Sequence, residues 1–231
     1  MQFNGKTIKC ITFDLDDTLW HCLPVVHNAE FALFIWLGEL FPELVAQHTI
    51  QSLMQQRREY LQQFPEQAHD FSWQRRKWLE DILSKFGGTK DDVETGFQVY
   101  LKARSDIVLF DGAHEVLEKV NNRYRSGSIT NGNADVHMAG IGAFFDFSIT
   151  AAEAGAAKPS PIIFEAAVTA AGVEPENILH IGDDAERDML GAAKVGMQTL
   201  WVNPQGLKWK GKYSPGAQIR MISELNAFLE S

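Results

Sequence analysis

The stretch KCITFDLDDTLW, residues 9–20, places three aspartates within four positions at the end of an apolar run. β-Branched and aromatic residues from Lys6 to Asp14 predict a strand that ends in this acidic cluster. Side chains alternate along a strand, so Asp14 and Asp16 lie on the same side of the extended chain. Two carboxylates about 4 Å apart repel by roughly 4 kcal/mol at an effective dielectric constant of about 20. The pattern therefore indicates that a cation binds at the end of this strand.

Composition limits the classes of function. The chain has 231 residues, 45% hydrophobic and 22% charged, which suits one large core or a core with a smaller insert. The net charge of −9 disfavours nucleic acid and anionic membranes as partners, and the longest apolar stretch, FALFIWL, is too short to span a bilayer. No signal-peptide pattern opens the chain, and Cys10 and Cys22 form no disulfide framework. We expect a cytoplasmic protein with reduced thiols and no obligate protein partner; a redox role for Cys22 stays open.

The chain divides into a helical region and a mixed region. Residues from about 25 to 104 carry only amphipathic helical patterns, in four segments with short connections, which favours a four-helix bundle. From residue 107 onward, strand and helix patterns alternate, as in a parallel sheet with helices on both faces. We therefore expect an α/β core formed by residues 1–20 and 106–231, with a helical domain inserted at residues 21–105.

Polar residues follow four of the predicted strands. They are Asp14 and Asp16 after the first strand, Thr130 and Asn131 after the second, Lys158 in the loop after the third, and Asp183, Asp184 and Asp188 after the fourth. The carboxyl ends of parallel strands meet at one edge of a sheet, where ligands bind. The set therefore predicts a site that combines a hydroxyl, an ammonium group and several carboxylates.

Each motif alone has a simpler interpretation. A DxDxT sequence is often a turn closed by an aspartate side chain, a lysine before a proline is typical of solvated loops, and Asp188 fits an acid near a helix N-terminus. The four motifs in this order favour a catalytic site instead. None of the seven histidines lies at a metal-ligand spacing, and His180, in a buried strand, is expected to belong to the core.

The ordered motifs DLDDT, TNG, AKP and GDDAERD, with a helical insert after the first, resemble those of the haloacid dehalogenase superfamily of hydrolases over nearly the whole chain. The resemblance implies a Rossmann-like core, a mobile helical cap, Mg²⁺ and an aspartyl-enzyme intermediate. It implies that Asp14 and Asp183 bind Mg²⁺ through their side chains, and that Asp16 does so through its backbone carbonyl.

The same resemblance gives each residue a role. Asp14 would be the nucleophile, and Asp16 would protonate the leaving alkoxide and later deprotonate the attacking water. Thr130 and the backbone amide of Asn131 would hold the phosphoryl oxygens, and Lys158 would supply a positive charge to the same group and to Asp14. Asp184 and Asp188 would orient the metal ligands.

The second aspartate bears on the reaction type. Dehalogenases of this superfamily lack it, because halide leaves without a proton, whereas Asp16 is present here. Hydrolysis of a small phosphorylated metabolite is therefore the favoured interpretation. A dehalogenase or phosphomutase of the same fold, and a non-catalytic small-molecule binding module, stay open as alternatives.

The segments TFDLDDTLW, ITNGNA and ILHIGDD also resemble bacterial phosphatases that act on flavin mononucleotide and on the phosphorylated ribitylaminouracil precursor of riboflavin. Trp20 follows the first motif, and Trp73 and Arg76 lie three positions apart on one expected helix. We expect these side chains to offer an aromatic and cationic surface to the substrate. In the alternative, the tryptophans anchor the cap core and the arginines are solvated.

The strand SGSIT has unusually small residues, so how it packs against its neighbours stays an open question at the level of sequence.

Overall fold

The computed structural model describes residues 1–210 and 214–230, so residues 211–213 and 231 of the expected core lie outside the described part. The chain divides into two compact units. We call the first the sheet unit; it comprises Met1–His21, Val108–Gly132 and Gly140–Ser231. We call the second the helical unit; it comprises Cys22–Ile107 together with Asn133–Ala139.

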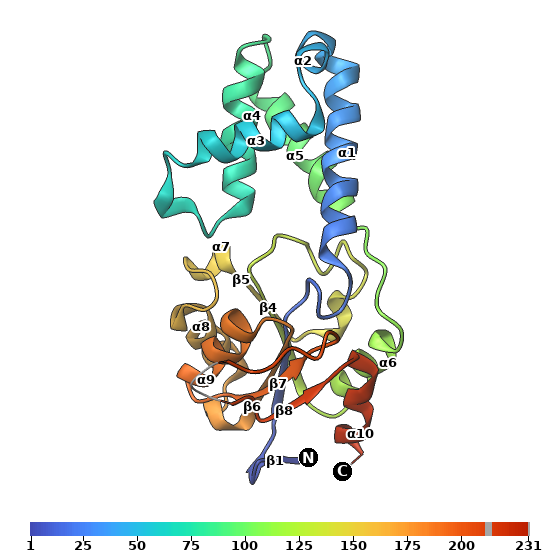
Figure 1. The fold of residues 1–231 in the computed structure, drawn as a ribbon, viewed down its shortest axis with the longest axis vertical. Helices are drawn as coiled ribbons and strands as arrows, with labels where there is room; N and C mark the ends of the chain where they lie inside the picture. Colours follow the sequence, from blue (N-terminus) through green and yellow to red (C-terminus); the bar gives the residue numbers. More distant parts are fainter. Residues whose placement is uncertain (211–213, 231) are drawn as a thin grey trace. The chain divides into compact units, whose positions relative to one another are not determined.

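A parallel sheet of six strands, in the order β5-β4-β3-β6-β7-β8, forms the centre of the sheet unit (Figure 1). The strands are β3 (Cys10–Phe13), β4 (Arg125–Thr130), β5 (Phe147–Thr150), β6 (Ile178–Gly182), β7 (Gln198–Val202) and β8 (Ala217–Ile219). A separate two-stranded hairpin pairs β1 (Gln2–Phe3) with β2 (Lys6–Thr7). The predicted α/β class with a helical insertion is confirmed, whereas β8 was not predicted.

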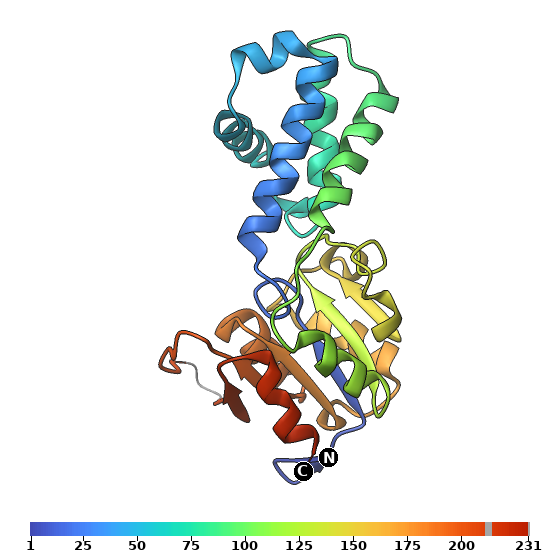
Figure 2. The same cartoon turned by 90° about the vertical axis from the view of Figure 1, so that its right-hand side faces the viewer.

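Helices cover both faces of this sheet (Figures 1 and 2). On one face α8 (Pro161–Ala171) packs against β4, β5 and α9 (Gly191–Lys194); on the other, α6 (Ala113–Asn121) packs with α10 (Leu225–Leu229). The short α7 (Ala151–Ala154) precedes α8. This arrangement buries both faces of the strands, which explains why β3 and β6 are buried at every position.

The small residues of β4 allow close packing with β5. A Cβ atom at Gly127 would lie 2.3 Å from the ring of Phe147, which is its register partner. The hydroxyls of Ser128 and Ser148, also register partners, lie 2.6 Å apart and share a hydrogen bond. The small-residue strand therefore makes room for one aromatic ring and satisfies its own polar groups.

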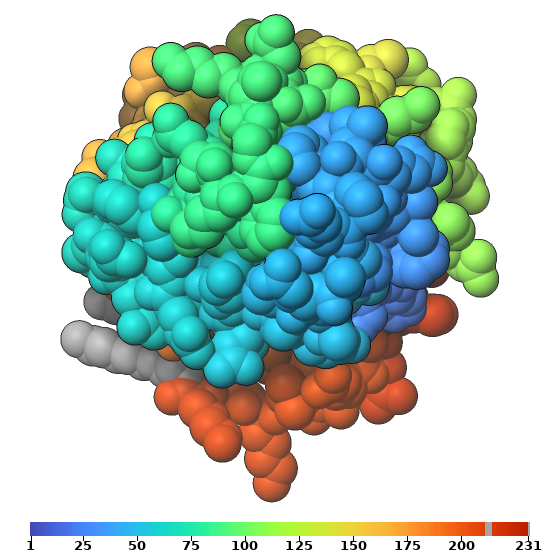
Figure 3. Space-filling model, turned by 90° about the horizontal axis from the view of Figure 1, so that it is seen from above, coloured from blue at the N-terminus to red at the C-terminus, as the bar shows by residue number. Residues whose placement is uncertain are grey.

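Five helices form the helical unit, one more than the four predicted: α1 (Cys22–Leu40), α2 (Pro42–Gln47), α3 (Ile50–Leu61), α4 (Phe71–Ser84) and α5 (Lys90–Arg104). The additional helix is α2, a short segment that begins at a proline. Thr49 and Thr89 cap α3 and α5 with capping boxes. Figure 3 shows one face of this unit, where the blue residues of α1 and α2 adjoin the cyan residues of α3 and the green residues of α5.

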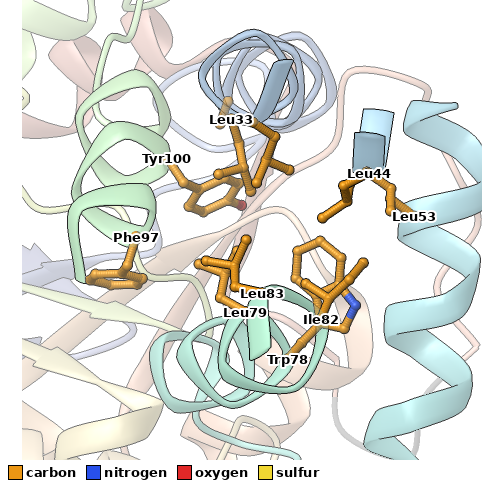
Figure 4. Close-up of a cluster of buried hydrophobic side chains, with 11 residues drawn as sticks. Leu33, Leu44, Leu53, Trp78, Leu79, Ile82, Leu83, Phe97 and Tyr100 are labelled. Carbon is orange, nitrogen blue, oxygen red and sulfur yellow. The ribbon is translucent and has the colours of Figure 1, made fainter. Parts of the chain in front are cut away.

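One hydrophobic core holds these five helices together (Figure 4). Every helix contributes to it, and the buried side chains are Ala29, Leu33, Leu37, Leu44, Leu53, Trp78, Leu79, Ile82, Leu83, Phe97 and Tyr100. A Cβ atom at Gly96 would lie 2.7 Å from the ring of Trp36, so a glycine is needed where α1 approaches α5. The unit therefore has a core of its own.

A buried ion cluster lies beside this core. The carboxylate of Glu30 on α1 accepts two hydrogen bonds from Arg57 on α3, at 2.7 and 3.1 Å, and two from Arg75 on α4, at 2.8 and 3.0 Å. The Arg75 guanidinium also stacks 3.5 Å from the centre of the Tyr100 ring on α5. Burial raises the pKa of Glu30, but the two guanidinium groups outweigh this effect and lower the pKa from 4.5 to about 2.

We expect Glu30→Gln to destabilise the helical unit by about 3–5 kcal/mol, because it leaves two largely buried arginines without a counter-charge. The pH dependence should change too. Since folding lowers the pKa of Glu30, its contribution is present above the unfolded pKa and is lost as the pH falls toward 2. Urea unfolding followed by helical circular dichroism, at pH 7 and pH 3, measures both effects.

Glu94→Gln is the matched control, because Glu94 pairs with Arg76 at the surface, where a salt bridge contributes at most about 1 kcal/mol. Equal losses in the two variants would contradict a stabilising role for the Glu30 cluster.

Candidate active site

The centre of the candidate site is the ammonium group of Lys158, whose side chain is only 3% exposed. It donates to Asp14 Oδ1 at 2.5 Å, to Asp188 Oδ1 at 2.6 Å and to the backbone carbonyl of Ile129 at 2.9 Å. A lysine has three N–H donors, so all of them have partners. Burial alone would lower the pKa of Lys158, but the two carboxylates outweigh it and raise the pKa, so the ammonium form is held at neutral pH.

The loop that carries Lys158 is attached to the end of β4. The side chain of Asn131 accepts a hydrogen bond from the Lys158 N–H at 2.7 Å and donates to the Lys158 carbonyl at 3.0 Å. Both polar atoms of the Asn131 side chain therefore bind the backbone of this loop. The hydroxyl oxygen of the neighbouring Thr130 accepts from the Gly132 N–H at 2.9 Å, and Thr130 is buried beside the cluster.

Asp188 is held on two sides. Its Oδ1 also accepts from His180 Nε2 at 3.1 Å, and its Oδ2 accepts from the Asp184 N–H at 3.1 Å. A Cβ atom at Gly182 would lie 2.4 Å from the Asp188 carboxyl carbon, so the glycine that ends β6 makes room for this side chain. Burial raises the pKa of Asp188, but Lys158 and His180 lower it more, and the carboxyl is ionised.

His180 lies in the core, as its position in an apolar strand suggested, and it also orients Asp188. Burial lowers the pKa of the imidazole, so it is neutral. Because ionised Asp188 can only accept, Nε2 carries the hydrogen, and Nδ1 accepts from the Thr12 hydroxyl at 3.0 Å. No motif pointed to this chain of hydrogen bonds, since Thr12 and His180 are distant in sequence and meet only across β3 and β6.

Asp184 begins the turn that contains Asp188. Its Oδ1 accepts from the N–H groups of Glu186 and Arg187, both at 2.8 Å. It thereby caps a π-helical turn (Ala185–Leu190) that continues into α9. Asp184 therefore positions Asp188 through the backbone and the first turn.

Thr18 and Trp201 position the remaining carboxylate, Asp183. The buried Thr18 hydroxyl lies 3.2 Å from Asp14 Oδ2 and 3.4 Å from Asp183 Oδ1. The indole N–H of Trp201, on β7, donates to the Asp183 backbone carbonyl at 2.7 Å. Thr18 belongs to the quoted DLDDT motif, but no pattern in the sequence pointed to Trp201.

The carboxylates can hold a divalent cation. One oxygen each of Asp14, Asp183 and Asp188 lie within 4.8 Å of one another. Three carboxylates face one ammonium group, which leaves an excess of two negative charges when all are ionised. Carboxylate oxygens are the ligands that Mg²⁺ prefers. Asp188 accepts three hydrogen bonds, two of them on Oδ1, whereas each oxygen of Asp14 accepts one and Asp183 Oδ1 is approached only by the Thr18 hydroxyl at 3.4 Å among the described residues. Asp14 and Asp183 therefore have more ligand capacity toward a cation than Asp188.

The directions of the pKa shifts in the cluster agree with this charge excess. Burial raises the pKa of Asp183 to about 7, and its acidic neighbours Asp188, Asp17 and Asp184 add to the effect. Burial likewise raises the pKa of Asp14, opposed by Lys158 and reinforced by Asp188 and Asp183. A cation between Asp14 and Asp183 would stabilise their charged forms. The residues present therefore fit a divalent metal ion.

Trp20 differs from the expectation drawn from sequence. Its side chain is fully buried in the sheet unit, so it cannot offer an aromatic surface to a substrate. Its indole N–H instead donates to Asp16 Oδ1 at 3.0 Å, and its backbone carbonyl accepts from the Asp17 N–H at 2.7 Å. Asp17 has a positive φ of 59°, which closes the turn between the motif and Trp20. The indole thus orients the half-buried Asp16.

Trp73 and Arg76 also have partners of their own within the helical unit. The Arg76 guanidinium donates twice to Glu94, at 2.7 and 3.1 Å, and stacks 3.5 Å from the centre of the Phe97 ring. The ring of Trp73 packs edge-on against Phe64, with centroids 5.3 Å apart. Both side chains thus contact residues of the helical unit, and their joint role toward the substrate stays a prediction.

Comparison with known proteins agrees with this geometry. The model for haloacid dehalogenase-like hydrolases matches residues 8–196. The chain belongs to this family of hydrolases. The resemblance stated from the four motifs is confirmed, and the matched segment includes Asp14, Lys158, Asp183 and Asp188.

Relatives of this haloacid dehalogenase-like hydrolase carry different activities in their names. The 5-amino-6-(5-phospho-D-ribitylamino)uracil phosphatase YigB of Escherichia coli (strain K12) is 28% identical over 230 residues, covering 96% of each chain. The glyceraldehyde 3-phosphate phosphatase of Pyrococcus abyssi (strain GE5 / Orsay) is 30% identical over 211 residues, covering 84% of this chain and 81% of the relative. A crystal structure described as 2-haloacid dehalogenase from Pseudomonas syringae pv. Tomato DC3000 has a TM-score of 0.88 and 36% identity, covering 97% of this chain and 99% of that one.

Among the residues that the structure describes, none of the helices combines the length and the apolar character that a membrane span requires.

We expect Mg²⁺ to raise the melting temperature of this hydrolase through the acidic cluster. A ligand at a hundred times its dissociation constant stabilises by about 2.7 kcal/mol, which corresponds to roughly 5–10 °C for a chain of this size. Differential scanning calorimetry with and without MgCl₂ measures the shift. Asp183→Asn should abolish most of it, whereas Glu165→Gln, an exposed acid on α8, should leave it unchanged. A full shift in Asp183→Asn would place the ion elsewhere.

Proposed function

We propose that this hydrolase is a Mg²⁺-dependent phosphatase that hydrolyses small phosphate monoesters through an aspartyl-phosphate on Asp14. The observation that carries the proposal is the contact of Asp14 Oδ1 with the Lys158 ammonium group at 2.5 Å, next to the acidic cluster. A lysine there compensates negative charge both on the carboxylate and on an incoming phosphoryl group. The names of several relatives, which are phosphatases of small metabolites, also support it.

In the first step, an oxygen of Asp14 attacks phosphorus and the ester P–O bond breaks, while Asp16 gives a proton to the leaving alkoxide. In the second, Asp16 takes a proton from water as the water oxygen attacks phosphorus, and the bond to Asp14 breaks to release inorganic phosphate. The Lys158 ammonium group would compensate the charge of the phosphoryl group, and the Thr130 hydroxyl and the Asn131 backbone N–H would donate to its oxygens. Bound Mg²⁺, held by Asp14, Asp183 and the Asp16 carbonyl, would neutralise phosphoryl charge so that a carboxylate can approach it.

Dehalogenation of a 2-haloacid is the second candidate, because the Pseudomonas structure similar to this chain bears that name. A carboxylate nucleophile serves both reactions. Asp16 distinguishes them, since a halide leaves without a proton and an alkoxide requires one. An acidic cluster with an excess of negative charge also suits a cation and a phosphate better than a halocarboxylate substrate.

For the substrate we propose flavin mononucleotide or the phosphorylated ribitylaminouracil of the riboflavin pathway. The name of the Escherichia coli relative, which matches this chain along 96% of its length, supports the second of these compounds. Both compounds are primary phosphate monoesters with a ribityl chain, and their alcohol leaving groups require the proton that Asp16 would supply.

We expect Asp14→Asn to lower phosphatase turnover by more than about a thousandfold while the protein stays folded, because an amide cannot attack phosphorus. The parent should release phosphate from p-nitrophenyl phosphate and no chloride from 2-chloropropionate. If the parent releases chloride and Asp14→Asn does not, the result favours a dehalogenase. If the phosphatase activity of Asp14→Asn stays within tenfold of the parent, Asp14 is not the nucleophile.

Trp20→Phe tests the orientation of Asp16, because it keeps a buried ring and removes the N–H that holds the Asp16 carboxylate. We expect turnover of alkyl phosphates to fall about tenfold or more and turnover of p-nitrophenyl phosphate to fall much less, since nitrophenolate leaves without a proton. The measured quantity is the ratio of kcat values for the two substrates.

Trp78→Phe is the matched control: Trp78 is a buried tryptophan of the helical unit, and no described residue accepts from its N–H. This variant loses the same atoms without losing a hydrogen bond, so the ratio should stay at the parent value. An equal change of the ratio in both variants would mean that Trp20 acts through stability alone.

A further inference from the structure

The imidazole of His180 lies at a position in the sheet core where an apolar side chain could pack as well. Its neighbours in β6 are Leu179 and Ile181, and every residue of this strand is buried. Burial of a polar ring is costly unless its nitrogens are hydrogen-bonded, and here Nδ1 binds Thr12 while Nε2 binds Asp188. An apolar side chain would avoid this cost altogether. The presence of a histidine is therefore best explained by what its N–H donates to.

The imidazole has a fixed orientation. Thr12 and His180 are register partners on β3 and β6, so their side chains leave the sheet on the same face. From α8, the ring of Phe164 meets the imidazole edge-on, with centroids 5.3 Å apart and an angle of 83° between the planes. A Cβ atom at Gly191 would lie 2.4 Å from the Phe164 ring, so a glycine makes room for this ring. The Nε2–H group is thus aimed from a rigid part of the core.

The carboxylate of Asp188 has two possible roles. It binds Lys158, but one of its oxygens also lies within 4.8 Å of oxygens of Asp14 and Asp183, close enough to share a cation with them. Among the described residues, Lys158 and His180 both donate to Oδ1. A carboxylate oxygen has two lone pairs, so these two donors together occupy Oδ1.

The other oxygen of Asp188 is confined by the backbone. Oδ2 accepts from the Asp184 N–H at 3.1 Å, and a Cβ atom at Gly182 would lie only 2.5 Å from it. Oδ1 is therefore the oxygen whose partners can change. If the neutral donor His180 were absent, one lone pair of Oδ1 would become available to a cation.

The contact between Asp188 and Lys158 must persist through the proposed reaction. When Asp14 forms its bond to phosphorus, it no longer offers a full carboxylate charge to the ammonium group. Lys158 is then held by Asp188 and by the backbone carbonyl of Ile129. If Asp188 turned toward the cation at this stage, the ammonium group would lose its remaining carboxylate partner.

We infer that His180 is a positioning residue of this hydrolase: its Nε2–H keeps the Asp188 carboxylate as the partner of Lys158 and out of the ligand set of the divalent cation. The inference rests on the proposed function, because the cation and the phosphoryl group are taken to lie at Asp14. It divides the labour between two neighbouring acids, so that Asp183 binds the ion and Asp188 holds the lysine.

Two variants of His180 test this role. His180→Gln keeps an N–H donor the same number of bonds from the backbone as Nε2, whereas His180→Phe keeps a buried ring beside Phe164 without a donor. Isothermal titration calorimetry with MgCl₂ measures cation binding without turnover. We expect Mg²⁺ to bind His180→Phe about tenfold more tightly than the parent, because the oxygen that loses a hydrogen bond gains the ion as its partner. Binding to His180→Gln should stay near the parent value.

Turnover of p-nitrophenyl phosphate is the second readout. We expect kcat to fall about tenfold or more in His180→Phe, where Lys158 loses its fixed partner, and to recover in His180→Gln. A merely structural role would lower the stability of the variants without tightening Mg²⁺ binding. A lower kcat with unchanged Mg²⁺ affinity in His180→Phe would therefore overturn the inference.

A spectroscopic measurement does not depend on the folding of His180→Phe. In protein labelled with ¹⁵N-histidine, the signals of His180 are those that are lost in His180→Gln. Their chemical shifts should report a neutral ring with the hydrogen on Nε2, both with and without MgCl₂. The opposite tautomer would overturn the inference, because Nε2 could then not donate to Asp188.

Ser148→Ala is the matched control. Ser128 and Ser148 are also register partners joined by a hydrogen bond between side chains, at 2.6 Å, but they lie on β4 and β5 outside the cluster. This variant should leave kcat and Mg²⁺ affinity at the parent values, and an equal gain in Mg²⁺ affinity would remove His180 as its specific cause.

The measurements separate this inference from the proposed function. Equal Mg²⁺ affinity in the parent and both His180 variants would overturn the role of His180 and leave the phosphatase assignment intact. Absence of p-nitrophenyl phosphate hydrolysis by the parent would instead contradict the phosphatase assignment, whatever the calorimetric result.

Discussion

The buried ammonium group of Lys158, between the carboxylates of Asp14 and Asp188, is the interaction on which the site depends. Removing charges from water is costly, and the cost is offset here because every N–H of the ammonium group has an acceptor. The contacts connect the ends of β3 and β4 to the turn after β6, so one cation fixes three segments. Without it, Asp14 and Asp188 would repel each other in a buried environment, and the site would lose its geometry along with its charge balance.

The parallel sheet supplies the charges of this cluster from separate segments, and small residues let them approach. Gly182 leaves room for the Asp188 carboxylate, and Thr18 bridges Asp14 and Asp183 with a single hydroxyl. Trp201 holds the carbonyl of Asp183 from the neighbouring strand. The acids are thus oriented by groups that carry no charge at neutral pH. Such groups can fix carboxylates in place without cancelling the negative charge that attracts a cation.

Much of this arrangement is predictable from the sequence, because alternating strand and helix patterns identify a parallel sheet, and the carboxyl ends of its strands must share an edge. That constraint alone brings Asp14, Lys158, Asp183 and Asp188 to one place. Other features depend on contacts that no local pattern encodes. The three residues of β8 show no alternation of their own, and its pairing with β7 is visible only in three dimensions. Likewise, the burial of Trp20 follows from the turn that it closes, whereas its position in the sequence suggested a surface contact.

Charge balance distinguishes the two buried ionic clusters of this chain. In the helical unit, one carboxylate faces two guanidinium groups, and aromatic rings compensate the surplus positive charge: Arg75 stacks on Tyr100 and Arg57 lies 5.3 Å from the Trp78 ring centre. That cluster is complete and serves stability. In the sheet unit, three carboxylates face one ammonium group, and no aromatic ring can compensate surplus negative charge in the same way. Such surplus charge is relieved either by protonation, consistent with the raised pKa of Asp183, or by a bound cation. For this reason we assign the candidate ligand site to the acidic cluster rather than to the arginines.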